Sequence, residues 1–119
     1  MDEAHKRLRV ARLTQDGGFP GPAINPAYYA MLNAARAALS GKDLFAKTHP
    51  GTWTLFRREF ARTGRFEAAL VEPVEEIRKQ RIEADCNARD VEPQRAKEIL
   101  DQAERFVESV ATMIESSER

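Results

Sequence analysis

The chain of 119 residues has one cysteine, two histidines and no long hydrophobic run. Because Cys86 is the only cysteine, an internal disulfide and a zinc site of the finger type are excluded. No apolar stretch approaches the roughly 20 residues needed to cross a bilayer, and residues 1–6 (MDEAHK) lack the apolar segment of a signal peptide. These absences predict a cytoplasmic protein with no membrane association.

The common sequence motifs of enzymes are also missing. The chain has no glycine-rich phosphate loop, no Gly-x-Ser-x-Gly elbow and no His-Glu-x-x-His pair. His5 and His49 are far apart in the sequence, and neither has a glutamate at metal-ligand spacing. Adjacent carboxylates such as Glu75 and Glu76 point in different directions on a helix and are poorly placed as an acid and base pair. We therefore expect neither a metal nor a cofactor.

The formal net charge is zero, with 19 Lys and Arg against 19 Asp and Glu, but the two signs are separated along the chain. Residues 1–65 hold 11 basic and 5 acidic residues, whereas residues 66–119 hold 8 basic and 14 acidic. One interpretation is that helices of opposite charge lie side by side in one bundle. The other is a basic face on the amino-terminal half that meets RNA or an acidic partner protein.

The dominant feature of the sequence is helical periodicity, in a composition of 42% hydrophobic and 32% charged residues that is typical of a folded domain. No segment alternates with a period of two over five residues, so no sheet is expected. We predict an all-α, up-and-down bundle of four to five helices that forms a single domain over residues 1–119. The expected helices cover residues 2–14, 26–40, 66–84 and 93–114, with the third helix following a turn at residues 48–52, carrying Trp53, Phe56 and Phe60 on one face and ending at Thr63-Gly64.

Glycine and proline set the expected boundaries of these helices. The run Asp16–Pro22 predicts a loop, so that residues 1–22 form a short basic helix with a Gly/Pro-rich connection and residues 23–114 form the bundle core. Asn25 and Pro26 predict the start of the alanine-rich second helix, which we expect to be central and buried on more than one side.

Two further prolines mark the later helices. Pro73 is expected to start or bend the fourth helix, because proline interrupts the hydrogen-bond ladder. Turn-forming residues from Asp85 to Glu92 lead to Pro93, which is expected as the first residue of the last helix.

One group of side chains in the fourth helix could carry chemistry. Arg78, Arg81 and Asp85 are three and then four residues apart, so they share a helical face. Two guanidinium groups beside a carboxylate could bind a phosphate or stabilise negative charge that develops on it. The alternative is an exposed salt bridge from Arg81 to Asp85, which would contribute roughly 0.3–0.5 kcal/mol.

Several segments in a fixed order resemble the HEPN domain family, the small helical domains of prokaryotic toxin–antitoxin and defence loci. The resemblance covers roughly residues 23–114, and its motifs are Pro26-Ala27-Tyr28-Tyr29-Ala30-Met31 with Ala34-Ala35-Arg36-Ala37-Ala38-Leu39, then Lys47-Thr48-His49 with Gly51, Leu55-Phe56, Phe60 and Thr63-Gly64, then Arg81 with Ala84-Asp85, and finally Ala96, Leu100, Ala103 and Phe106-Val107.

The resemblance implies a helical bundle that forms a homodimer and is paired with a small nucleotidyltransferase protein encoded nearby. Active members of the family resemble metal-independent ribonucleases, in which an arginine and a histidine four to six residues apart meet across the dimer. The arginine would stabilise charge on the phosphorane and the histidine would transfer protons. The resemblance thus predicts a component that binds its partner, RNA or both, with a nucleotide-binding domain as a further alternative.

This sequence departs from that motif, because positions 83–88 read Glu-Ala-Asp-Cys-Asn-Ala and contain no histidine. An unperturbed carboxylate such as Asp85 has a pKa near 4 and is a poor proton donor at neutral pH. His49 could act instead from another helix across a dimer, or could serve as a capping or packing residue. The candidate catalytic residues are therefore Arg78, Arg81, Asp85 and His49, and Cys86 is interpreted as a half-buried thiol.

Overall fold

The computed structural model describes residues 1–86 and 91–117, and within these residues the chain is helical without a strand. This confirms the predicted all-α class. Five α-helices are joined by short connections and by two irregular turns, named here η1 and η2. The elements are α1 (Asp2–Asp16), α2 (Pro20–Ser40), α3 (His49–Phe56), η1 (Arg57–Ala61), η2 (Ala68–Leu70), α4 (Val74–Cys86) and α5 (Pro93–Ser117).

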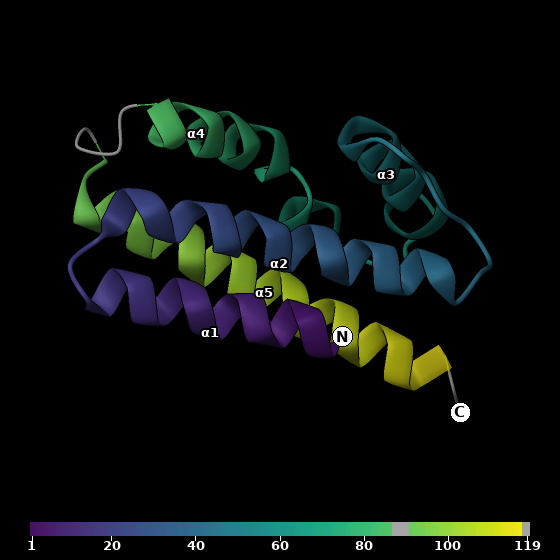
Figure 1. The fold of residues 1–119 in the computed structure, drawn as a ribbon. Coiled ribbons are helices and arrows are strands. Elements are labelled where there is room, and N and C mark those ends of the chain that lie inside the picture. Colours follow the sequence, from purple (N-terminus) through teal and green to yellow (C-terminus); the bar gives the residue numbers. More distant parts are fainter. Residues whose placement is uncertain (87–90, 118–119) are drawn as a thin grey trace.

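The centre of the bundle is α2, which packs against each of the other four helices. Six of its alanines are buried, and their small side chains let the neighbouring backbones approach closely. In Figure 1, α1 and α5 lie along one side of α2, while α3 and α4 lie next to each other along the opposite side. The prediction of a central second helix buried on more than one side is therefore confirmed.

The second helix begins six residues earlier than predicted, at Pro20 rather than Pro26, and the expected loop over residues 16–22 is reduced to residues 17–19. Pro20 and Pro22 both lie in the first turn, where the backbone N–H groups have no partner inside the helix, so proline removes no hydrogen bond there. Gly18, with a φ of 92°, makes the sharp turn between the two helices.

The first helix is part of the core rather than a segment that precedes it. Its residues Ala4 and Ala11 are fully buried, and α1 packs along α2 and α5. Arg12 forms ion pairs with Asp101 (2.9 Å) and Glu104 of α5. Basic α1 and acidic α5 therefore lie side by side, as the first interpretation of the charge separation predicts.

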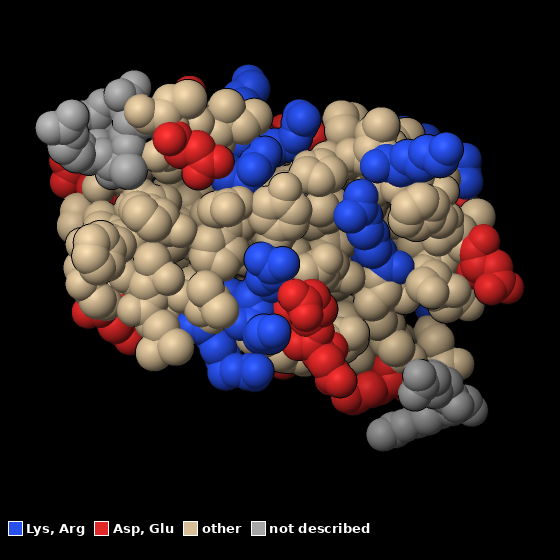
Figure 2. All heavy atoms as spheres, viewed as in Figure 1, with Lys and Arg blue, Asp and Glu red and all other residues tan. Residues whose placement is uncertain are grey.

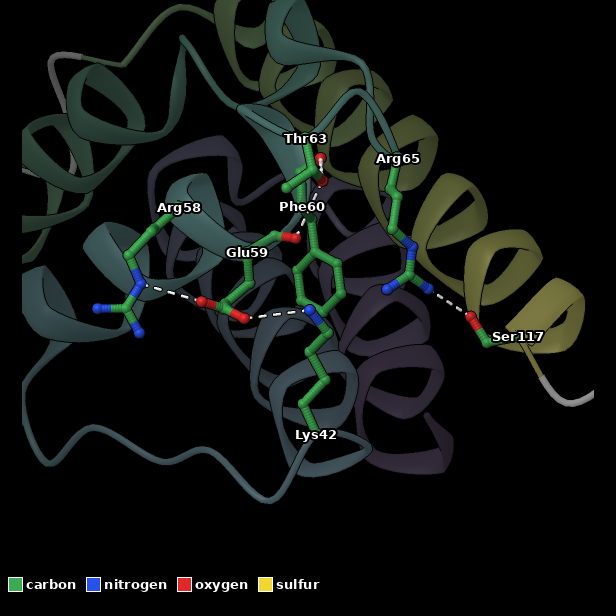
Figure 3. Close-up of polar contacts among 7 residues, drawn as sticks. All are labelled: Lys42, Arg58, Glu59, Phe60, Thr63, Arg65 and Ser117. Atoms are coloured by element: carbon green, nitrogen blue, oxygen red, sulfur yellow. Dashed lines mark hydrogen bonds and ion pairs between the residues drawn. The ribbon is translucent and has the colours of Figure 1, made fainter.

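The third helix changes its winding before it ends. After Phe56 the chain forms the wider π-type turn η1, and Gly64, with a φ of 80°, reverses it. Figure 3 shows how this turn is held: Glu59 accepts hydrogen bonds from Lys42 (3.1 Å) and Arg58 (3.0 Å), while Lys42 and Arg65 lie against the Phe60 ring. These contacts lower the pKa of Glu59, chiefly through Lys42.

The fourth predicted helix is shorter than expected. Residues 66–73 form a loop with the short turn η2, and the helix begins only at Val74, directly after Pro73. The apolar residues Phe66 and Val71 are buried although they lie in no continuous helix. In this segment the spacing of apolar residues therefore reflects burial and does not indicate a helix. Of the two effects expected of Pro73, starting or bending the helix, the structure shows the first. The turn expected over residues 85–92 is wrong for Asp85 and Cys86, which end α4, and residues 87–90 of it lie outside the described residues.

Aromatic rings fill the core between α3, η1 and α5. The Phe106 ring lies 5.7 Å from Trp53, 5.4 Å from Phe56 and 5.1 Å from Phe66, measured between ring centroids. All four side chains are at most 5% exposed.

None of the helices described is both long and apolar enough to cross a membrane.

Replacement of Phe106 by alanine is expected to lower the free energy of unfolding by about 3–5 kcal/mol, because it removes three ring contacts and leaves a cavity. Urea unfolding followed by circular dichroism measures the change. Phe45, which is 71% exposed, provides the matched control, and Phe45→Ala should shift stability by less than about 0.5 kcal/mol. Equal losses in the two variants would contradict the assignment of this core.

Candidate functional site

The candidate site is built around Tyr28, which is fully buried on α2. The Trp53 Nε1 atom donates a hydrogen bond to the Tyr28 hydroxyl oxygen (3.2 Å), and the same hydroxyl lies 3.3 Å from Nδ1 of His49. The Thr48 side chain caps α3 by accepting a hydrogen bond from the Gly51 N–H (3.0 Å). Because Thr48 is the cap, the His49 imidazole at the first helical position is free to face Tyr28.

The Tyr28 hydroxyl is shared between two neighbours. It accepts a hydrogen bond from Trp53 Nε1, and it either donates its own proton to Nδ1 of His49 or accepts one from it, depending on the tautomer of the imidazole. When Nδ1 is the acceptor, the proton of the neutral ring lies on Nε2; in the other tautomer Nε2 carries a lone pair.

Arg81 of α4 lies over the same aromatic rings as His49. Its Cζ atom is 5.3 Å from the ring centroid of Tyr28 and 5.4 Å from that of Tyr29, and the His49 ring is 5.7 Å and 5.6 Å from the same two centroids. The fold thus brings His49 together with Arg81 in one chain, although they are 32 positions apart in the sequence. Arg78 lies one turn earlier on α4.

Three arginines place positive charge near His49: Arg36, Arg78 and Arg81, here called the arginine cluster. The Nε atom of each is buried and has no hydrogen-bond partner among the described residues. The ion pairs of Arg78 and Arg81 are long, at 4.0 Å to Glu75 and 3.9 Å to Asp85. A buried donor without a partner costs about 1–3 kcal/mol, so an anion that accepts these hydrogen bonds would be stabilised here.

The cluster also changes the titration of its neighbours. Burial lowers the pKa of His49, and the positive charges of Arg36, Arg81 and Arg78 lower it further, because a second cation is unfavourable there. Burial raises the pKa of Tyr28. Both groups are therefore uncharged at neutral pH, and the positive charge of the site belongs to the arginines.

The sequence predictions for this site fare unequally. Arg78, Arg81 and His49 converge, whereas Asp85 is 53% exposed and meets Arg81 only at 3.9 Å, beyond hydrogen-bond distance. The Arg81–Asp85 pair expected as the alternative is thus present but loose. Cys86, the last residue of α4, is exposed and not half-buried as expected.

Sequence reasoning missed the contribution of α2. Tyr28 and Tyr29 were interpreted only as core residues, and Arg36 was not selected, although Asn25, Tyr29 and Arg36 share one helical face by their spacing. A polar stripe on an alanine-rich helix is the signal that could have revealed them. Figure 2 shows basic side chains distributed over the face that carries α1, α2, α3 and α4.

The described residues contain no group of three or more potential metal ligands.

Comparison with known proteins gives a consistent family assignment. The model of the family described as "HEPN domain" matches residues 1–114. A Gloeobacter violaceus protein named "UPF0332 protein glr0978" is 30% identical over 91% of this chain and 87% of its own length. A "UPF0332 protein" of Thermotoga maritima is 29% identical over 100% of this chain and 86% of its own length. A Methanocaldococcus jannaschii protein named "Putative toxin MJ0605" is 27% identical over 92% of this chain and 82% of its own length.

The lowered pKa of His49 predicts a pH dependence of stability. The unfolded chain takes up a proton on this histidine near pH 6.5, whereas the folded chain does so only at lower pH. The stabilising contribution is present above pH 6.5 and is lost as the pH falls from 6.5 through the folded pKa. Urea unfolding between pH 5 and 8 should show that the free energy of unfolding falls more steeply with decreasing pH for the wild type than for His49→Gln. Identical pH slopes would contradict the burial of the imidazole among cations.

Proposed function

This chain belongs to the HEPN domain family, and from that membership we propose that it is the toxin-type component of a two-protein module and that its arginine cluster binds the phosphate backbone of RNA. The name "Putative toxin" of two archaeal relatives supports the first part of this proposal. The geometry of Arg36, Arg78, Arg81 and His49 supports the second part.

The observation that carries the proposal is the set of buried guanidinium donors without partners. A guanidinium group presents a planar fork of N–H donors that matches two oxygens of a phosphate. Arg78 and Arg81 project from one helix, and Arg36, on α2, adds a third positive charge that acts on His49. A phosphodiester placed between them would accept the donors that the protein itself leaves unsatisfied.

The histidine fits a binding role in the same site. In the tautomer in which Nδ1 of His49 accepts the hydrogen bond from the Tyr28 hydroxyl, Nε2 bears an N–H group that can donate to a phosphate oxygen. The relay from Trp53 through Tyr28 fixes the ring orientation before any ligand arrives. A preorganised neutral donor beside three cations favours recognition of phosphate over proton transfer.

Partner binding forms the other half of the proposal. As the family resemblance implies, the chain would form a homodimer and associate with a small nucleotidyltransferase protein. Exposed apolar side chains offer contact area for such associations, among them Leu13 (72% exposed) and Ile82 (46% exposed).

Loss of one arginine from the cluster should weaken RNA binding and reduce its salt dependence. With a fluorescein-labelled RNA oligonucleotide, Arg81→Ala is expected to lower the slope of log K against log salt by about one unit, because one phosphate contact is lost. Anisotropy titrations over a series of KCl concentrations measure the slope.

The matched control for this experiment is Arg105→Ala, which removes the same charge from an exposed position on α5. It should leave the salt slope unchanged. If Arg105→Ala and Arg81→Ala weaken binding equally, the positive charge acts non-specifically and the proposed site is wrong.

One observation favours RNA cleavage as a second candidate function. His49 is uncharged beside the arginines, and in its other tautomer Nδ1–H would donate to Tyr28 and leave a lone pair on Nε2. That nitrogen could take the proton of a ribose 2′-hydroxyl while its oxygen bonds to phosphorus, the bond to the 5′-oxygen breaks and water supplies a proton to the leaving oxygen. The arginines would stabilise the charge on the phosphorane.

This second function predicts cleavage of labelled RNA in the presence of EDTA, as in the metal-independent members of the family. His49→Gln should slow cleavage by about 10²- to 10⁴-fold while RNA binding is retained, whereas Arg81→Ala should reduce both. Gel electrophoresis of the products provides the measurement. Intact RNA after incubation with the wild type would leave phosphate binding as the function of the site.

A further inference from the structure

A second aromatic residue, Tyr29, contacts Arg81 and His49 and has no function assigned to it in the proposed phosphate site. Its ring is partly exposed and meets Tyr28 and His49 edge to face, at 5.6 Å between ring centroids in both cases. Arg81 of α4 lies 5.4 Å from the Tyr29 ring centroid, and Arg7 of α1 lies 5.8 Å from it. Three helices thus converge on this ring, and two of them bring a cation.

The contact with Arg7 extends the basic surface from α4 across α2 to α1. Figure 2 shows basic side chains on this face over both α1 and α4. Arg7 is held by Glu3 at 3.1 Å, and both side chains are about half exposed, at 45% and 54%. Exposed ion pairs of this kind contribute little to stability. The Arg7 guanidinium can therefore move aside or rotate when a ligand binds against the Tyr29 ring.

An aromatic ring next to guanidinium groups is the usual surface on which proteins stack an unpaired nucleobase. The base would lie on Tyr29 and the planar Arg7 group, while its neighbouring phosphate meets Arg81, whose Cζ is 5.4 Å from the same ring. Ring and phosphate donors are thus close enough to serve one nucleotide. In contrast, the bases of an A-form duplex are stacked inside the helix and cannot reach a ring that adjoins the phosphate site.

From these contacts we infer that Tyr29 and Arg7 form a nucleobase-stacking position and that the chain selects RNA in which the bound nucleotide is unpaired. This inference rests on the proposed function, because the arginine cluster must hold the phosphate for Tyr29 to meet the base. It adds a substrate class and two binding residues, one of them in the first helix, which the sequence did not associate with the site.

The experiment compares three fluorescein-labelled ligands with the same number of phosphates per strand: a single-stranded RNA, the same strand in a duplex, and the same strand with abasic sites. The single strand should bind the wild-type chain about 10-fold more tightly than either of the other two, because only it supplies stackable bases. Tyr29→Leu should remove most of that advantage, whereas Tyr29→Phe, which keeps the ring, should retain it. Arg7→Ala should reduce it in part.

The abasic ligand separates a stacking role from a structural one. If Tyr29→Leu weakens binding of the abasic strand as much as that of the intact strand, the residue only supports the fold and the inference is overturned. Equal affinity of the wild type for the duplex and the single strand overturns it as well. Thermal unfolding of each variant verifies that the bundle is intact, and Leu8→Ala, another replacement on α1, provides the control for non-specific effects.

The same titrations distinguish failure of this inference from failure of the proposed function. If Arg78→Ala and Arg81→Ala leave the binding of all three ligands unchanged, the phosphate site itself is wrong. If both variants weaken all three ligands while Tyr29→Leu changes none, the phosphate site is supported and only the stacking position is rejected.

Discussion

The buried hydroxyl of Tyr28 is the contact on which the arrangement of this molecule depends. Tyr28 lies in the central helix, and its hydroxyl links Trp53 of α3 to His49 at the start of the same helix. Its ring also supports Arg81 of α4. A buried hydroxyl needs hydrogen-bond partners, and this one side chain ties α3 to α2 through both Trp53 and His49.

That arrangement leaves a concentration of positive charge that the protein does not neutralise. The positive charges of Arg36, Arg78 and Arg81 all act on an uncharged histidine, and the buried Nε atoms of the three have no partner among residues 1–86 and 91–117. Elsewhere the molecule pairs its charges readily, as Arg12 does with Asp101 and Glu104. The two interpretations of the charge separation are thus compatible: the part of α1 that faces α5 is paired, while the surface near α4 keeps unpaired donors. A bundle that tolerates unsatisfied donors at one place gains the capacity to bind an anion there.

The family motif and this site differ in where the histidine comes from. The resemblance implies an arginine and a histidine on one helix, whereas here His49 approaches Arg81 from the start of α3. The hydrogen bond with the Tyr28 hydroxyl holds Nδ1 of the imidazole against α2. Under the function proposed above, this member of the family keeps phosphate recognition although positions 83–88 contain no histidine.

The sequence by itself determined the helical class, the central position of the alanine-rich helix and the start of α4 after Pro73, because apolar periodicity and proline are local signals. It failed for residues 16–22, where prolines fall in a first turn that loses no hydrogen bond, and for residues 66–73, where burial imitates helical spacing. It also selected Arg78, Arg81 and Asp85 as one group on a helical face, with His49 reaching them from another helix across a dimer. Only the tertiary structure decided that Arg81 and His49 meet at Tyr28 and Tyr29 and that Asp85 stays at the edge, since contacts between α2, α3 and α4 depend on how the helices pack and not on spacing within any one of them.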